Sequence, residues 1–128
     1  MSPYTAWEIL GAYEAILIAF NRTRDRIVAR EVALADTAAS RAQGLLGRDR
    51  MEAEEGLWIV PCPMIHTFFM RFPIDVLFLD RNLRVRRVIE DLKPWRLSPW
   101  VFTAHSVLEL PAGALDGSVS EGDLLEIR

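Results

Sequence analysis

Apolar residues recur at a spacing of about two along most of the chain, and this spacing predicts a protein built largely from short β-strands. The segments concerned are rich in β-branched and aromatic residues and are bordered by proline, asparagine, aspartate or glycine. The predicted strands cover residues 17–20, 27–33, 57–60, 65–70, 74–79, 106–110 and 124–127, and a further irregular strand covers 83–89. The polar residues 21–25 are expected to join the first two strands as a hairpin.

Two segments carry helical patterns instead. A capping box predicts a short helix over residues 6–13. Asp36 or Thr37 is expected to cap a second helix, which Gly47 should end because glycine readily adopts the left-handed conformation. Gly44 would lie inside that helix. The apolar residues of this second helix recur at i, i+4, i+7 and i+8, and they are Ala38, Ala42, Leu45 and Leu46.

The arrangement of these elements indicates the fold class. Helices are few and do not alternate with the strands, which argues against a doubly wound parallel sheet. We therefore expect an α+β fold, a small and mostly antiparallel, partly closed β-barrel or rolled sheet with one or two covering helices. A length of 128 residues fits one domain. Residues 1–20 are expected to form an N-terminal helix and strand extension, and residues 21–128 a single α+β domain.

Charge and cysteine content narrow the possible partners. The formal net charge of −3 argues against nucleic-acid binding, which needs a positive field. Cys62 is the single cysteine, so the chain has neither an internal disulfide nor a repeated-cysteine zinc site, and we expect no metal and no cofactor. A lone thiol favours a reducing compartment, so a cytoplasmic location is expected. Glu8 and Glu14 interrupt an apolar start that lacks a basic region, so we predict no signal peptide, no transmembrane segment and no contact with a membrane surface.

Polar residues inside the apolar segments near the middle of the chain form the candidate site. An unpaired buried carboxylate at Asp75 would cost several kcal/mol. Asp75 therefore either accepts backbone N–H groups, pairs with an arginine, or faces a cleft as a ligand-binding or catalytic group. His66 and Thr67 interrupt a similar apolar segment. If residues 71–73 form a hairpin loop, Thr67 and Asp75 share one sheet face and His66 lies on the other, but a slip of one residue reverses this.

Cys62 precedes His66 by four residues and could form a thiol–imidazole pair. An inert, half-buried thiol is the favoured interpretation. The two histidines, His66 and His105, together with Cys62 and Asp75 have no spacing that is diagnostic of a metal site.

Other charged and aromatic residues have competing interpretations. Arg41, Arg48 and Arg71 could present guanidinium groups to an anion, or could pair with acidic side chains of the protein. Glu109 alternates with Leu108 and Leu110, and this pattern is typical of a solvent-facing strand position. Three tryptophans could line a sugar-binding face, namely Trp58, Trp95 and Trp100. Roles in the core or as loop anchors are favoured for them.

The order of motifs from about residue 21 to the end resembles a known family. The motifs are Ala35-Asp36-Thr37, Gly44-Leu45-Leu46-Gly47-Arg48, Gly56-Leu57-Trp58, the run from Ile65 to Asp80, Val107 to Gly113, and Gly122-Asp123. They are similar to the uncharacterised ACR family, also called domain of unknown function 192, in the branch that carries Ile-His-Thr. The resemblance implies a small β-rich fold and no assigned activity.

Three functions are compatible with these residues. The first is a non-catalytic binding module that holds a small polar or anionic ligand, or a loop of a partner, in a shallow pocket. The residues of that pocket would be His66, Thr67, Arg71 and Asp75, with Arg48. The second is a hydrolase with Asp75 and His66 in acid–base roles. The third is an assembly or accessory protein that docks through its apolar N-terminal segment. The oligomeric state stays open.

Overall fold

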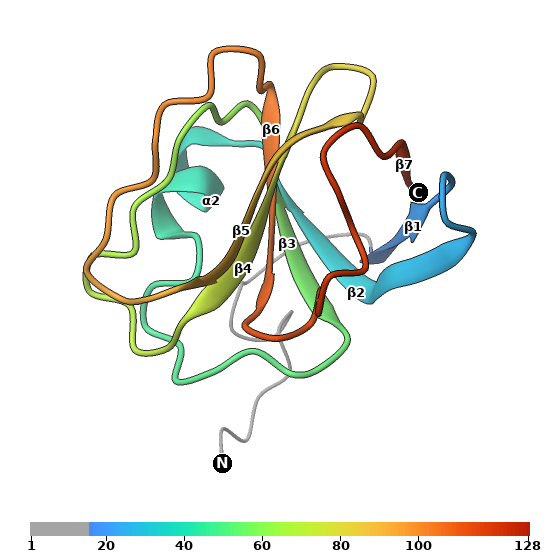
Figure 1. Cartoon of the computed structure of the whole chain (residues 1–128). Coiled ribbons are helices and arrows are strands. Elements are labelled where there is room, and N and C mark those ends of the chain that lie inside the picture. Colours follow the sequence, from blue (N-terminus) through green and yellow to red (C-terminus); the bar gives the residue numbers. More distant parts are fainter. Residues whose placement is uncertain (1–15) are drawn as a thin grey trace.

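Seven strands form one mixed sheet in the computed structural model, which describes residues 16–128 (Figure 1). The helix expected over residues 6–13 lies outside the described part. The strands are β1 (Ile16–Asn21), β2 (Arg26–Ala35), β3 (Glu55–Ile59), β4 (Ile74–Leu79), β5 (Val85–Leu92), β6 (Ser106–Pro111) and β7 (Leu125–Ile127). Their order across the sheet is β5-β4-β6-β3-β2-β1-β7. The predicted strand-rich fold is confirmed, and within residues 16–128 a single short helix accompanies it.

The helix belongs to the connection between the two parallel strands. β2 and β3 run parallel, whereas the other neighbouring strands are antiparallel. Parallel strands cannot be joined by a tight turn, so the chain crosses over between them. That crossover contains α2 (Ala38–Gln43), which Thr37 and Ser40 begin with a capping box. The helix ends earlier than predicted, because Gly44 adopts a φ of 46° and donates its N–H to the Ser40 carbonyl.

Both faces of the central strands are covered by apolar side chains. In β4, Ile74, Val76 and Phe78 belong to one core, and Leu77 and Leu79 belong to another. The first core lies between the sheet and the segments after α2 and β3. Side chains of β1, β2 and β7 complete the second core. These three strands lie on the opposite side of β6 from α2 in Figure 1. Alternating positions of the central strands therefore face two interiors rather than an interior and solvent.

The two ends of the sheet approach each other at one point. A single β-bridge joins Arg84 to Leu124, just before β5 and β7 begin. The Val85 N–H bonds the Asp123 carbonyl at 2.8 Å, and the Leu125 N–H bonds the Leu83 carbonyl at 2.9 Å. The edge strands β5 and β7 are not neighbours in the sheet order, so the sheet is not closed.

The strand predicted over residues 65–70 is wrong. This segment is a loop with one bridge, between His66 and Leu97. The chain turns after Thr67, whose carbonyl accepts the Met70 N–H at 3.2 Å, and Phe69 has a φ of 64°. β4 pairs with β5 and β6 instead, so the hairpin proposed around residues 71–73 does not form.

Candidate functional site

Asp75 lies in the middle of the sheet and is saturated by main-chain donors. Its side chain is 0% exposed. Its Oδ1 accepts the Asp91 N–H at 2.8 Å, and its Oδ2 accepts the N–H groups of Gly113 and Leu115 at 3.2 and 3.0 Å. The carboxylate thereby ties the end of β5 to the turn after β6. These bonds match the structural interpretation of Asp75 rather than an open, ligand-binding one.

Thr67 joins the loop after β3 to the loop after β5. Its hydroxyl donates to the Lys93 carbonyl at 2.6 Å and accepts the Arg96 N–H at 2.8 Å. The next link along the same two loops is Ser98, whose Oγ accepts the Ile65 N–H at 2.9 Å. Thr67 is fully buried, so its polar atoms hold the two loops together and do not face solvent.

The two arginines of the predicted site are occupied by acidic partners. Arg48 is buried and its Nη2 bonds Glu55 Oε1 at 3.0 Å, while Oε2 lies 2.8 Å away but out of line for a hydrogen bond. Arg71 is exposed and its Nη1 lies 2.6 Å from Asp49 Oδ1. The two guanidinium groups therefore sit in different environments and do not converge on Asp75.

His66 lines a cavity that Thr67, Arg71, Asp75 and Arg48 do not line. Its Nδ1 accepts the Phe68 N–H at 3.2 Å, which leaves Nε2 to carry the ring proton. The imidazole also stacks on the Phe68 ring, with 5.1 Å between ring centroids. Because Asp75 does not line this cavity, the structure does not assemble the acid–base pair of His66 and Asp75.

An exposed aromatic surface continues from His66 and Phe68. Phe69 and Trp95 pack against each other with ring centroids 4.7 Å apart. Trp95 and Trp100 are 56% and 53% exposed, so they do not bury their indoles in the body of the domain. A place in the core is therefore wrong for these two indoles, whereas the packing of Trp95 on Phe69 joins the loop after β5 to the loop after β3.

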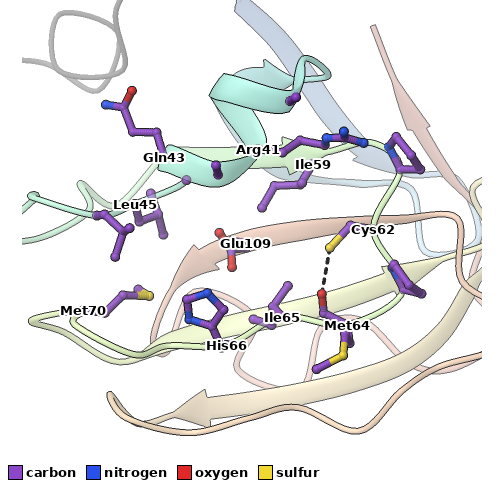
Figure 2. Close-up of a pocket in the computed structure, with 16 residues that line it drawn as sticks. Arg41, Gln43, Leu45, Ile59, Cys62, Met64, Ile65, His66, Met70 and Glu109 are labelled. Carbon is purple, nitrogen blue, oxygen red and sulfur yellow. Dashed lines mark hydrogen bonds between the residues drawn. The ribbon is translucent and has the colours of Figure 1, made fainter.

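The cavity that His66 lines opens between α2 and the loop after β3 (Figure 2). Its volume is about 340 Å³, within the range of roughly 300–1,000 Å³ that small-molecule sites occupy. Its walls are mainly aliphatic or sulfur-containing, and they include Leu45, Ile59, Met64, Ile65 and Met70. Its polar or ionisable side chains are those of Arg41, Gln43, Cys62, His66 and Glu109.

Glu109 forms the floor of this cavity, hereafter the Glu109 pocket. Its residue is 3% exposed, so the solvent-facing position predicted for it is wrong. In the sheet it lies beside Leu57 of β3 and Val76 of β4, which both belong to the first core. Strand partners point to the same face, so Glu109 points toward that core. Figure 2 shows its carboxyl group directed into the pocket, between α2 and His66.

The Glu109 carboxyl group has no charged or hydrogen-bonding partner among residues 16–128. Burial alone raises its pKa to about 8, because the low-dielectric surroundings disfavour the ionised form. The guanidinium group of Arg41 does not pair with the Glu109 carboxyl group, since Arg41 lies on the Cys62 side of the pocket (Figure 2). At neutral pH the empty pocket therefore holds Glu109 mostly as a neutral acid that can ionise when a suitable group arrives.

Cys62 is a protonated thiol at the other side of the pocket. Burial raises its pKa to about 11, and the negative charge of Glu109 raises it further, which outweighs the lowering effect of the Arg41 charge. The Sγ donates to the Met64 carbonyl at 3.0 Å. A thiol with so high a pKa is a poor nucleophile at neutral pH, in agreement with an inert role.

The described residues contain no group of three or more His, Cys, Asp or Glu side chains that could hold a metal ion. No helix within residues 16–128 is long and apolar enough to cross a membrane.

Comparison with known proteins identifies relatives of the same size. A family model described as Uncharacterized ACR matches residues 18–127. The UPF0127 protein of Pyrococcus horikoshii is 40% identical over 88 residues, which cover 65% of this chain and 74% of that protein. A protein of unknown function from Novosphingobium aromaticivorans has a TM-score of 0.74 at 24% identity and covers 88% of this chain and 84% of its own. A Sinorhizobium meliloti protein described as a candidate transcription regulator has a TM-score of 0.71 at 28% identity, over 86% and 90% of the two chains.

Proposed function

This chain belongs to the Uncharacterized ACR family, and on that premise we propose that it is a non-catalytic binding module that holds a small molecule in the Glu109 pocket. One observation carries the proposal. Glu109 is 3% exposed, points into a cavity and has no partner within the described part of the chain. A buried carboxyl group without a partner costs stability, and an apolar residue there would cost less. A ligand that hydrogen-bonds to the Glu109 carboxyl group would offset this cost, so ligand binding explains why the group is at this position.

The pocket divides into an apolar wall and a polar floor. Leu45, Ile65 and Met70 would contact the body of the ligand, and Glu109 would bond to its polar group. Of the residues predicted from the sequence, we propose that His66 contacts the ligand through Nε2. Thr67, Asp75, Arg48 and Arg71 would act indirectly, by holding the surrounding loops and strands in place.

A binding role fits the groups at the site better than catalysis does. The Cys62 thiol is protonated, and the Asp75 carboxylate is occupied by three main-chain donors, so neither is available as a nucleophile or base. The Sinorhizobium meliloti protein is described as a candidate transcription regulator, a role that involves nucleic acid. The net charge of −3 of this chain does not favour nucleic-acid binding, so we do not propose that role here. We also propose that the bridge between Arg84 and Leu124 makes the sheet a partly closed barrel. Because Cys62 is a free thiol, we further propose that the protein works in a reducing, cytoplasmic compartment.

A fragment screen by ligand-observed NMR tests the proposal. Ala42 lines the pocket and is exposed, so Ala42→Trp should fill the entrance without disturbing the core. Ala39 is exposed on the same helix but does not line the pocket, so Ala39→Trp is the matched control. Fragments should bind the wild type and Ala39→Trp and lose binding to Ala42→Trp. Equal binding to all three proteins, or no binding to the wild type, would contradict the proposal.

A further inference from the structure

The buried acidic side chains of the described part differ sharply in how they are neutralised. Glu55 pairs with Arg48, and Asp75 accepts three backbone N–H groups. Asp123 accepts bonds from Asn21, Arg24 and the Ser120 N–H. Glu109 has no such partner within residues 16–128, although it is as buried as the others. A hydrogen-bonding partner for Glu109 therefore has to come from outside these residues.

The surroundings of Glu109 indicate what kind of donor fits. A carboxylate offers two oxygens and accepts several hydrogen bonds at once. The neighbouring Cys62 thiol already donates to the Met64 carbonyl, so it does not serve Glu109. The His66 imidazole also lies near the floor but has a single N–H donor, on Nε2. The rest of the lining there is aliphatic, and the positive charge of Arg41 lies on the Cys62 side of the pocket (Figure 2). A compact group with several N–H donors and a positive charge would match the two oxygens, and an aliphatic chain would match the walls.

We propose, on the basis of the binding function proposed above, that the ligand of the Glu109 pocket is an aliphatic primary amine, bound as an ammonium ion against the Glu109 carboxylate. An ammonium group carries three N–H donors and a full positive charge on a small volume. It therefore satisfies the carboxylate and removes the cost of its isolated charge. The alkyl chain lies against Leu45, Ile65 and Met70.

This ligand class makes a prediction about protons that other classes do not make. Glu109 is mostly protonated in the empty pocket at neutral pH and must lose its proton to pair with an ammonium ion. Amine binding should therefore release one proton and strengthen as pH rises toward 8. A ligand that accepts a hydrogen bond from neutral Glu109 should do the opposite. The other ionisable or charged groups that face the pocket are Arg41, Cys62 and His66.

Binding of hexylamine, hexanol and hexanoate, measured by ligand-observed NMR and calorimetry, tests the inference. Hexylamine stays protonated below about pH 10, as lysine does. Its affinity should exceed those of hexanol and hexanoate and should rise about tenfold per pH unit between pH 6 and 7, levelling off above 8. Glu109→Gln should lower hexylamine affinity at pH 8 at least tenfold and remove the pH dependence. His66→Gln should keep the pH dependence, because Glu109 is intact.

The outcomes separate this inference from the binding function beneath it. Stronger binding of hexanol or hexanoate, or affinity that falls as pH rises, would overturn the amine assignment while leaving a small-molecule site in place. A pH dependence that survives in Glu109→Gln and disappears in His66→Gln would also overturn it. Failure of all three probes to bind would overturn the inference, and the fragment screen with Ala42→Trp and Ala39→Trp decides the binding function independently.

Discussion

Asp75 and Glu109 lie on the neighbouring strands β4 and β6, one residue out of register, and point to opposite faces of the sheet. Asp75 pairs with Leu110, whereas Glu109 pairs with Val76. Leu110 belongs to the second core and Val76 to the first. Asp75 is held by three main-chain donors, and Glu109 faces a pocket without a partner in the described chain. One carboxyl group therefore builds the fold, and the other is available to a ligand.

Replacing Glu109 should change how stability depends on pH. Its pKa is about 8 in the folded protein and ordinary in the unfolded chain, so the folded state keeps a proton that the unfolded state has already lost. The contribution of Glu109 to stability is therefore fully present below about pH 4.5 and is lost as pH rises toward 8, by up to about 1.4 kcal/mol per pH unit. Glu109→Gln should lose this slope and be more stable than wild type at pH 8. Urea unfolding of both proteins at about pH 5.5, 7 and 8.5 measures the difference, and parallel curves would contradict the assignment.

Removing the Asp75 carboxylate should destabilise the protein without acting through the pocket. Asp75→Ala leaves the N–H groups of Asp91, Gly113 and Leu115 without an acceptor, and each unsatisfied group costs about 1–3 kcal/mol. A loss of at least about 3 kcal/mol is expected in urea unfolding. Asp75→Asn keeps one acceptor oxygen and should lose less. If Asp75→Asn folds but loses fragment binding to the pocket, the purely structural role is wrong.

The buried pair of Arg48 and Glu55 should depend on both partners. Glu55→Gln leaves the Arg48 guanidinium charge buried and unpaired, at a cost of about 3–5 kcal/mol. Replacing both residues, as Arg48→Met with Glu55→Leu, should restore most of that stability because no charge remains to be solvated. Unfolding free energies of Arg48→Met, Glu55→Leu and the double variant form the cycle. Additive effects would show that the pair does not act as a unit.

The Cys62 thiol should react slowly with alkylating reagents. With a pKa of about 11, about one thiol in 10,000 is ionised at pH 7. Alkylation by iodoacetamide should be at least about 100-fold slower than that of free cysteine, and should accelerate up to pH 10. Protein unfolded in urea should react like free cysteine, which controls for the reagent. Rapid alkylation of the folded protein at pH 7 would reopen a nucleophilic role for Cys62.

Local patterns predicted the elements whose stability is local. A helix cap at Asp36 or Thr37 and the apolar run of β4 (Ile74–Leu79) were both predicted, and each specifies a structure within a few residues. The segment 65–70 has the composition of a strand but forms a loop. There the bonds of Thr67 to Lys93 and Arg96, across more than twenty intervening residues, outweigh β-propensity, and no local pattern reports such bonds.

The candidate site was harder to predict, because alternation does not reveal what covers each face of a strand. Glu109 between Leu108 and Leu110 has the same pattern whether its own face meets water or a second core. In β6 (Ser106–Pro111) the consecutive apolar residues Val107 and Leu108 point to opposite faces, and this was the available signal that both faces are covered. Asp75 carried the same signal and drew attention first. Burial marks both carboxyl groups, and only the three-dimensional arrangement shows which one has a partner.

The crossover between the parallel strands β2 and β3 supplies a different part of the pocket from the sheet. Residues 36–54 contribute α2 and one wall of the pocket, while the floor belongs to β6, a different part of the chain. Insertions or deletions in this connection would reshape the entrance and the upper wall while the hydrogen-bonded ladder beneath stayed intact. Selectivity could then diverge among related proteins through this one segment, with the same acidic floor retained.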